Sequence, residues 1–265
     1  MSYKTIAIRA AKSAGKKLMK HYNNHSFTVH EKMFHDIVTS VDIDAENIYL
    51  DILKKETPEF NILTEEKGKI FNNKKSNYLW IIDPLDGTKN FYFHNPIFAT
   101  SIALAYLPDL KPENAEIILG VVYAPFLKET FVAEKGKGAF LNGKRIYVSQ
   151  KTTISESINT YCHGSEKEST LRAVETFKVL FQKSRSFRQL GAGTVEHSYV
   201  ACGRTESIMI PGVKTWDAAA GALLVREAGG KVTDYQGNEW NLASKDILAT
   251  NGKIHSAILK DLKNI

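Results

Sequence analysis

Apolar and polar residues follow one another along the chain with two different periods, and each period predicts a different kind of element. In five stretches apolar residues recur every three or four positions, which predicts helices. These stretches are residues 2–22, 42–56, 166–183, 194–203 and 216–229. Short apolar and β-branched runs bounded by turn-forming residues predict strands. These runs are residues 60–64, 78–83, 98–106, 116–124, 129–134, 157–161, 204–210, 231–235 and 246–250.

The order of these elements predicts the fold class. Strand runs follow one another closely between residues 98 and 148, and Leu141-Asn142-Gly143-Lys144 has the Asn-Gly pair of a tight hairpin turn. This region is therefore expected to form antiparallel sheet, whereas helices and strands alternate in the later half. No repeat, low-complexity tract or linker interrupts the chain of 265 residues, which is long enough for one large domain or two. The pattern predicts an α/β or α+β fold.

Composition and charge narrow the function only slightly. Hydrophobic residues make up 43% and aromatic residues 10% of the chain, as in ordinary globular proteins. Lys and Arg exceed Asp and Glu by 35 − 29 = 6, which fits an anionic substrate or nucleic acid. Much of this excess lies in solvated-looking lysine runs near the N-terminus. The net charge therefore does little to distinguish between these classes of ligand.

Cysteine usage and the longest apolar run indicate the compartment. The two cysteines, Cys162 and Cys202, form no Cys-x-x-Cys pair or Cys/His cluster that would suggest zinc. We expect free thiols in a reducing compartment, with a single disulfide as the alternative. The N-terminal stretch is an amphipathic helix rather than a signal peptide, and residues 117–127 are too few to span a bilayer. A cytoplasmic protein is expected.

Residues 80–91 carry the most specific chemical signal. An apolar strand runs into Asp83, Pro84 ends it, and Asp86-Gly87-Thr88 opens a tight turn. Two carboxylates three positions apart at the end of a rigid strand are hard oxygen ligands, which suit magnesium. The glycine lets backbone approach a ligand closely, and the threonine adds a hydroxyl beside the acids. The alternative is a solvated turn, because Asp, Pro and Gly are turn formers.

Further acids stand at the ends of three distant elements. Glu65-Glu66 follows the strand at 60–64, while Asp42 and Asp217 stand where helices are expected to begin. Taken singly, Asp42 and Asp217 are explained as helix-start residues, and the Glu pair as a solvated corner. Four acidic sites at element ends are poorly explained in this way when taken together. They favour a shared metal site.

These motifs resemble the inositol monophosphatase family. Its metal-binding signature is similar to Asp83-Pro84-Leu85-Asp86-Gly87-Thr88, and its second signature to Trp216-Asp217-Ala218-Ala219-Ala220-Gly221. The resemblance extends from about residue 36 to the mid-240s. Within the family, Thr64-Glu65-Glu66 and residues 223–230 are most similar to the bacterial branch whose members are described as extragenic suppressor proteins. The other matching segments are 38–42, 65–66, 120–125, 136–140, 141–143 and 225–230.

The resemblance implies a fold and an assembly. The expected fold is the layered α-β-α-β-α sandwich of the sugar-phosphatase superfamily, as a single domain over residues 1–265. Its two sub-layers would comprise roughly residues 1–150 and 151–265, with the metal site between them. The family also implies a homodimer and inhibition by lithium.

The resemblance also implies a set of metal ligands and catalytic roles. Glu65, Asp83 and the carbonyl of Leu85 would hold a first Mg²⁺. Asp83, Asp86 and Asp217 would hold a second, with a third, weaker ion near Glu65. Thr88 would orient the attacking water, Asp42 would accept the proton of its hydroxyl, and Glu65 would assist. This is general-base catalysis, with no covalent intermediate expected.

The substrate contacts are carried over in the same way. The expected contacts are Asp86, Gly87, Thr88, Gly191, Ala192, Gly193, Lys214 and Asp217. For the segment 191–193 a plain strand-to-helix turn is the alternative, and for Lys214 a solvent-facing lysine.

The chain departs from the inositol-phosphatase pattern where the substrate is chosen. Ile210 stands where those enzymes carry a glutamate that bonds sugar hydroxyls, and Lys214 stands where they carry a histidine. Lys89 is similar to the residue found in the 3'(2'),5'-bisphosphate nucleotidase branch. A mobile-loop lysine of the family falls at Glu31 or Lys32. The histidines His94, His163 and His197 lack ligand spacing and are expected to be surface or core residues.

We therefore predict a Mg²⁺-dependent phosphomonoester hydrolase, with inositol 1-phosphate as nominal substrate and direct attack by water. The first alternative is a bisphosphate nucleotidase that uses the same metal site. The second belongs to another class, a protein that binds RNA or RNA polymerase, suggested by the suppressor branch and the basic charge. Association with a membrane is not expected.

Overall fold

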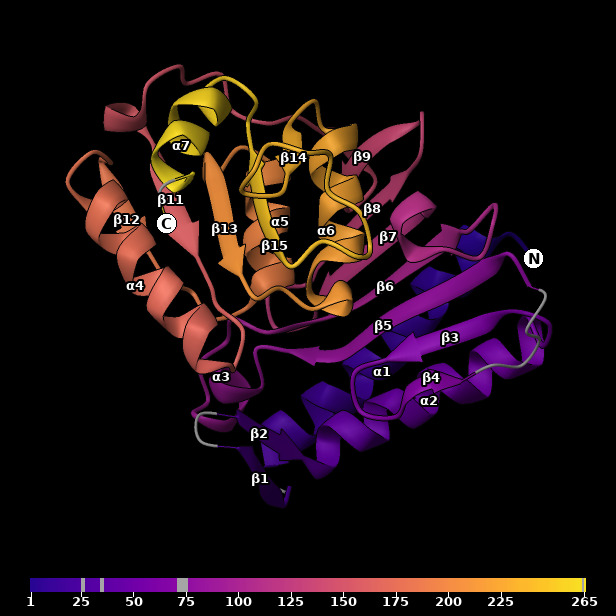
Figure 1. The fold of residues 1–265 in the computed structure, drawn as a ribbon. Helices are drawn as coiled ribbons and strands as arrows, with labels where there is room; N and C mark the ends of the chain where they lie inside the picture. Colours follow the sequence, from indigo (N-terminus) through magenta and orange to yellow (C-terminus); the bar gives the residue numbers. More distant parts are fainter. Residues whose placement is uncertain (25–26, 34–35, 71–75, 264) are drawn as a thin grey trace.

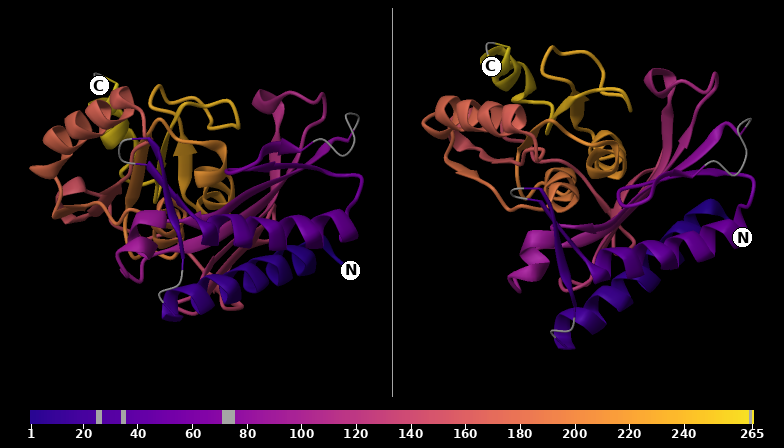
Figure 2. Two further views of the ribbon diagram at one scale, coloured as in Figure 1. Left: turned by 90° about the horizontal axis from the view of Figure 1, so that it is seen from below. Right: turned by 60° about the horizontal axis from the view of Figure 1, so that its bottom comes forward.

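The structure, a computed structural model, describes residues 1–24, 27–33, 36–70, 76–263 and 265. Its elements form successive layers of helix, sheet, helix, sheet and helix (Figure 1). Helices α1 and α2 cover the outer face of the larger sheet, and α5 and α6 lie between the two sheets. Helices α4 and α7 cover the outer face of the smaller sheet (Figures 1 and 2). The expected α-β-α-β-α sandwich is confirmed.

The long helices agree with the apolar periodicity, with ends that differ by a few residues. The described helices are α1 (Tyr3–Asn24), α2 (Ser40–Glu56), α3 (Thr88–Tyr92), α4 (Lys167–Phe181), α5 (Gly193–Ala201), α6 (Thr215–Glu227) and α7 (His255–Leu262), with short 3-10 turns at Pro112–Asn114 and Ile154–Glu156. Among the described residues, no helix has the length and apolar character that crossing a bilayer requires.

The larger sheet has eight strands in the order β10-β9-β8-β7-β6-β5-β3-β4. It is antiparallel from β5 to β10, as the closely spaced runs predict, while β3 and β5 are parallel. The expected Asn-Gly hairpin joins β9 to β10, with Asn142 and Gly143 both at positive φ. The strands are β3 (Asn61–Thr64), β4 (Gly68–Ile70), β5 (Tyr78–Asp86), β6 (Ala99–Tyr106), β7 (Glu116–Ala124), β8 (Glu129–Glu134), β9 (Gly138–Leu141) and β10 (Lys144–Ile146).

The smaller sheet has five strands in the order β12-β11-β13-β15-β14. Strand β11 is parallel to both β12 and β13, and β15 runs antiparallel to its neighbours. Its strands are β11 (Ile158–Tyr161), β12 (Ser186–Arg188), β13 (Ser207–Pro211), β14 (Lys231–Thr233) and β15 (Asp246–Thr250). A separate two-stranded sheet pairs β1 (Val29–Met33) with β2 (Asp36–Thr39).

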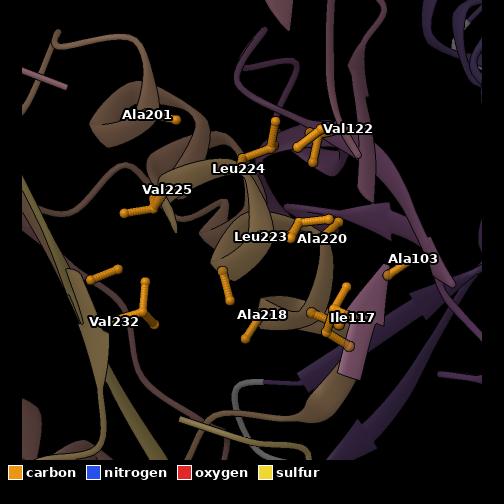
Figure 3. Packing of buried hydrophobic residues seen from close by; sticks show 14 of the residues in the cluster. Ala103, Ile117, Val122, Ala201, Ala218, Ala220, Leu223, Leu224, Val225 and Val232 are labelled. Atoms are coloured by element: carbon orange, nitrogen blue, oxygen red, sulfur yellow. The ribbon is translucent and has the colours of Figure 1, made fainter. Parts of the chain in front are cut away.

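Strand alternation distributes the core among the layers. On β5, Trp80 and Ile82 pack with α1 and α2, whereas Ile81 faces the opposite way and packs with α5 and α6. On β13, Ile208 faces the central helices and Met209 faces α4 and α7. Full burial of such a side chain contributes roughly 1.5–3 kcal/mol. Figure 3 shows α6 in the central layer, with its side chains reaching both sheets.

Small residues let the central helices approach their neighbours closely. A Cβ on Gly120 of β7 would lie 2.8 Å from the carbonyl oxygen of Ala220 on α6. A Cβ on Gly221 would lie 2.4 Å from the Cβ of His197 on α5. Since no real side chain fits at these distances, glycine at both positions sets the spacing of α6 from β7 and from α5.

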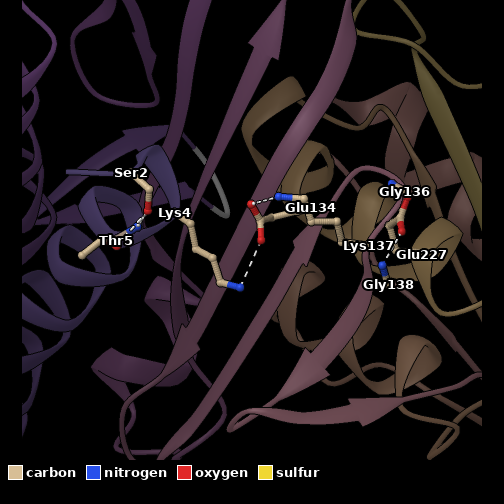
Figure 4. Close-up of polar contacts among 8 residues, drawn as sticks. All are labelled: Ser2, Lys4, Thr5, Glu134, Gly136, Lys137, Gly138 and Glu227. Atoms are coloured by element: carbon tan, nitrogen blue, oxygen red, sulfur yellow. Dashed lines mark hydrogen bonds and ion pairs between the residues drawn. The ribbon is translucent and has the colours of Figure 1, made fainter.

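Polar contacts join the outer elements to the sheet (Figure 4). Lys4 of α1 lies 3.1 Å from the carboxylate of Glu134, and Glu227 at the end of α6 accepts from the amides of Gly136 and Gly138, each at 2.7 Å. The turn between β8 and β9 is thereby tied to the C-terminus of α6.

Two expectations about the elements were wrong or incomplete. The strand predicted to end at Asp83 continues to Asp86, because pairing with β6 shifts register after Asp83 and resumes at Asp86 opposite Ala99. The two intervening residues, one of them a proline, form an irregularity rather than an end. The short elements β1, β2, β4, β12, α3 and α7 were not predicted, and β9 and β10 were predicted only through the hairpin turn between them.

Candidate active site

Acidic side chains from four elements surround the end of β5. Asp83 is 1% exposed, and its pKa is raised well above its ordinary value by burial and by the negative charges of Glu65, Asp86, Asp217 and Asp42. The parallel pairing of Thr64 with Ile82 brings Glu65, in the turn after β3, level with Asp83. The structure therefore brings together the acids that the sequence analysis selected, although they come from distant parts of the chain.

Asp42 and Thr88 meet directly. Asp42 is the third residue of α2, and its Oδ2 accepts from the amide of Thr39 at 2.8 Å and from its hydroxyl at 2.5 Å. The other oxygen, Oδ1, accepts from the hydroxyl of Thr88 at 3.1 Å, and the carbonyl of Leu85 lies 3.0 Å from that hydroxyl. Burial raises the pKa of Asp42 to about 6, against the lowering effect of these donors.

Asp86 holds the start of α5. Its Oδ1 accepts from the amide of Gly193 at 3.0 Å, and its Oδ2 from the amide of Thr194 at 2.8 Å and its hydroxyl at 2.5 Å. The residue before the helix, Ala192, provides no side-chain cap. The Asp86 carboxylate of β5 thus accepts from the first amides of α5 in place of a capping side chain. Such a cap typically contributes about 0.5–2 kcal/mol to stability.

The segment 189–193 packs backbone to backbone against the turn after β5. A Cβ on Gly87, which has φ 84°, would lie 3.3 Å from the carbonyl oxygen of Gly191 and 3.0 Å from that of Ile97. The side-chain amide of Asn90 donates to the carbonyls of Ile97 and Leu190, each at 2.7 Å. Glycine at this turn is therefore required by the close approach of two backbone segments as well as by its φ.

A pocket of about 520 Å³ opens beside these acids. Six of the predicted site residues line it, namely Asp86, Gly87, Thr88, Gly191, Gly193 and Asp217. The rest of its wall is formed by Ile37, Lys89, Asn90, Cys162, His163, Gln189, Leu190 and Ile210.

Some predicted contacts lie elsewhere. Lys214 does not line this pocket; its ammonium group lies 3.2 Å from Glu166, and it borders a neighbouring hollow. Ala192 is buried behind the wall. The side chains of Glu31 and Lys32 lie outside the described part of the chain. Cys162 and Cys202 are free, as expected.

His94 and His197 are structural residues, as expected, whereas His163 lines the pocket. His197 is fully buried on α5 and His94 contacts the ring of Tyr22, with 4.9 Å between ring centroids. His163 lines the pocket, and its Nδ1 lies 2.8 Å from the carbonyl of Gly164.

The donor chemistry fits a divalent cation of the hard, oxygen-binding class. The carboxylates of Asp83, Asp86 and Asp217 and the carbonyl of Leu85 are the ligand types that magnesium prefers. In the described residues no three His, Cys, Asp or Glu side chains already close around one point as metal ligands do. The carboxylate of Asp86 is bonded to the first amides of α5, and Oδ2 of Asp217 accepts from the amide of Lys214 at 3.3 Å. The fit therefore rests on the kind of donors and on the mutual repulsion of the acids.

Sequence reasoning missed several residues of the pocket wall. Asn90, Cys162, Gln189 and the buried Glu196 behind the wall were not selected. No sequence signal singled out Glu196, because Thr194, His197 and Ser198 are polar residues of the same helix and its hydrogen-bond partners lie in two other segments of the chain.

Comparison with known proteins places this geometry in a family. The model of the inositol monophosphatase family matches residues 2–265. Over 260 residues the chain is 39% identical to the fructose-1,6-bisphosphatase/inositol-1-monophosphatase of Thermotoga maritima, covering 98% of this chain and 95% of that protein. Over 261 residues it is 35% identical to the Nus factor SuhB of Escherichia coli K12, covering 98% and 95%. The solved structure of the extragenic suppressor protein suhB of Bartonella henselae superposes with a TM-score of 0.90 at 33% identity, covering 98% and 97%. The chain therefore belongs to the inositol monophosphatase family.

Proposed function

We propose that this protein is a Mg²⁺-dependent phosphomonoester hydrolase with inositol 1-phosphate as its nominal substrate. The observation that carries the proposal is the fully buried Asp83, surrounded by the negative charges of four other carboxylates beside an open pocket. Carboxylates whose negative charges raise the pKa of a buried acid repel it, and a buried negative charge is costly unless it is compensated. A divalent cation offsets that repulsion.

The residues that would hold the ions are those named from the resemblance. Glu65, Asp83 and the carbonyl of Leu85 would hold one Mg²⁺, and Asp83, Asp86 and Asp217 a second, with a third near Glu65. When bound, such ions neutralise the phosphate, acidify a water and stabilise the leaving oxygen.

Thr88 and Asp42 supply the orientation of the attacking water. Both donors of Thr39 occupy Oδ2 of Asp42, so Oδ1 faces the hydroxyl of Thr88. When this hydroxyl donates to Asp42, the lone pairs of its oxygen remain to accept a hydrogen from water. Glu65 assists as a further acceptor. As the water oxygen forms a bond to phosphorus, the water gives a proton to the Thr88 hydroxyl, whose own proton passes to Asp42. The ester bond breaks, and the leaving oxygen takes a proton from another water molecule.

The pocket wall supplies the substrate contacts. Backbone amides of Gly87 and Thr88 are proposed to bind the phosphate group, with the segment 191–193 and Asp217 on the alcohol side. Lys214 enters this set only if its ion pair with Glu166 opens, since 3.2 Å separates the two groups.

A second candidate is a phosphatase for substrates with a further anionic group, including 3'(2'),5'-bisphosphate nucleotides. Lys89 lines the pocket, is exposed, and forms no ion pair with any residue the structure describes. Ile210, 2% exposed, replaces a hydroxyl-binding acid in the same wall, and an unpaired polyol hydroxyl against it would be costly. The 39% identical Thermotoga maritima protein is named for a bisphosphate as well as a monophosphate substrate.

Phosphate release is the test that separates these candidates. We would measure it for inositol phosphates, adenosine bisphosphate, fructose bisphosphate and NADP, with Mg²⁺ and with EDTA. Release from at least one substrate that stops in EDTA supports the proposal, and the ranking selects the candidate. Release that persists in EDTA, or none on any substrate, refutes it.

A role in transcription is compatible with catalysis, and the 35% identity to Nus factor SuhB favours keeping it as a separate proposal. Retention of RNA polymerase or RNA by the purified protein would support it. Binding that disappears at moderate salt would show simple charge attraction instead. Homodimer formation, lithium inhibition and a cytoplasmic location complete the proposal; sedimentation and inhibition assays test the first two.

A further inference from the structure

Glu196 is a buried carboxylate that the proposed reaction does not use. It lies in the first turn of α5, directly behind the pocket segment 189–193, and is 0% exposed. Burial of an ionisable side chain is expensive, and an apolar residue of similar size often packs there at lower cost. The hydrogen-bond partners of Glu196 should therefore show why a carboxylate is buried at this position.

Three hydrogen bonds to the Glu196 carboxylate come from the pocket wall. Its Oε1 accepts from the amide of Leu190 at 3.1 Å and from the amide of Gly191 at 3.0 Å. The third donor is the thiol of Cys162, whose Sγ lies 2.9 Å away. Each of these three donors belongs to a residue that lines the pocket. The other oxygen, Oε2, is buried and has no hydrogen-bond partner among the described residues.

The same wall segment is held from its other side by Asn90. The amide of Asn90 donates to the carbonyl of Leu190 at 2.7 Å, so Leu190 is fixed through both of its main-chain polar groups. Gly191 follows with φ 76°, in the left-handed region, and is exposed to the pocket. A short segment with this conformation stays in place only when its amides have fixed acceptors.

We propose that Glu196 is a positioning residue of the pocket, which fixes the segment 189–193 through two amide bonds and engages the Cys162 thiol as a third donor. The effect on substrate rests on the proposed phosphatase function, whereas the hold on the wall and on the thiol does not. The segment 189–193 contacts the part of a substrate that lies away from Asp83. Loss of Glu196 therefore weakens substrate binding more than it slows the chemical step.

The bond to Glu196 also explains why a cysteine in the pocket is not a nucleophile. Burial, the negative charge of Glu196 and the hydrogen bond to it raise the pKa of Cys162 well above its usual value. The thiolate is the reactive form of cysteine, so this thiol is kept unreactive although it faces a cavity.

The first test is kinetic, with Glu196→Ala, Glu196→Gln and a matched control. The control is Ser198→Ala, which removes a buried hydroxyl on the same helix; among the described residues its one hydrogen-bond partner is the carbonyl of Thr194, at 2.8 Å. We expect KM to rise by about tenfold in Glu196→Ala with kcat changed much less, a smaller rise in Glu196→Gln, and no change in the control. A loss confined to kcat, or equal effects in the control, would overturn the proposal. If Glu196→Ala does not fold, the glutamine variant decides.

The second test needs no substrate and therefore stands even if the protein is not a phosphatase. Iodoacetamide labelling followed by peptide mass analysis gives the rates of Cys162 and Cys202 in the same molecule. Cys202 bonds to the carbonyl of Tyr199 rather than to Glu196 and serves as the internal reference. In Glu196→Gln we expect the ratio of the Cys162 rate to the Cys202 rate to rise by about threefold or more. An unchanged ratio would show that Glu196 does not control this wall.

Discussion

Replacement of Glu196 by glutamine should stabilise the protein above neutral pH and change its stability little in acid. Burial raises the pKa of Glu196 from an ordinary value of 4.5 to about 7. Between these pH values the folded protein keeps a proton that the unfolded chain has released. Stability from this group is therefore complete below pH 4.5 and is lost as the pH rises through 7.

The size of the effect follows from the same two values. An interval of about 2.5 pH units at about 1.36 kcal/mol each corresponds to about 3 kcal/mol. The groups that face Glu196 include the Cys162 thiol and the hydroxyl of Thr160 and, at longer range, Asp86 and Tyr161. Because Asp86 also titrates, the difference between variant and parent is measured at each pH, with EDTA present to remove cation binding.

Its neighbour His197 provides a comparison of opposite sign. Burial lowers the pKa of His197 from 6.5 to about 4, and its Nδ1 bonds the carbonyl of Gly193 at 2.7 Å. Between pH 6.5 and about 4, the histidine binds a proton in the unfolded chain but not in the folded protein. The stability that this group contributes is therefore present above pH 6.5 and is lost as the pH falls through 4. In His197→Gln the advantage over the parent should therefore grow toward acid pH.

Urea unfolding at intervals from pH 5 to 8 is the assay. The stability of Glu196→Gln relative to the parent should increase by about 2–3 kcal/mol across this range, since most of the titration falls within it. A difference that stays flat, or that decreases as the pH rises, would refute the reasoning. The opposite slope in His197→Gln shows that the assay resolves single buried groups.

Three further changes test the catalytic site. Asp83→Asn should abolish turnover and weaken Mg²⁺ binding measured by calorimetry, because Asp83 is the proposed bridging ligand; near-normal activity in excess Mg²⁺ would contradict that role. Thr88→Ala should reduce kcat by roughly 100-fold, with KM little changed, since the hydroxyl acts on the water; steady-state kinetics would refute this by showing a change in KM alone. Ile210→Glu should increase the use of inositol phosphate relative to adenosine bisphosphate, and an unchanged ratio of kcat/KM values would place specificity elsewhere.

Long elements with regular patterns could be predicted from the sequence, whereas short ones could not. The apolar stripe of α1 and the nearly continuous apolar runs of β6 and β7 extend over enough residues to be recognised. Strands such as β4, β10 and β12 have only three residues each, and pairing with a neighbour rather than a pattern defines them. Helix α3, with five residues, is set by the positive φ of Gly87 before it.

The residues of the candidate site also fall into those that the sequence could predict and those that it could not. Its acids could be selected because each stands at the end of a recognisable element, and the family signatures join two of them. The role of Asp86 in holding α5 could not be foreseen, since its partners Gly193 and Thr194 lie more than 100 positions away. Glu196 was equally hidden, because α5 is buried on all sides and has no polar face against which a buried carboxylate would stand out.

The central helices connect the acids to the pocket wall. Asp86 accepts from the first amides of α5, and Glu196 in the next part of that helix holds the segment 189–193. One short helix therefore binds a proposed metal ligand at its start and the substrate wall from its first turn. Its spacing from α6, which carries Asp217, is set by the contact of Gly221 with His197. A shift of α5 would move the wall and disturb Asp86 together, and the two sheets that enclose this layer restrain such a shift.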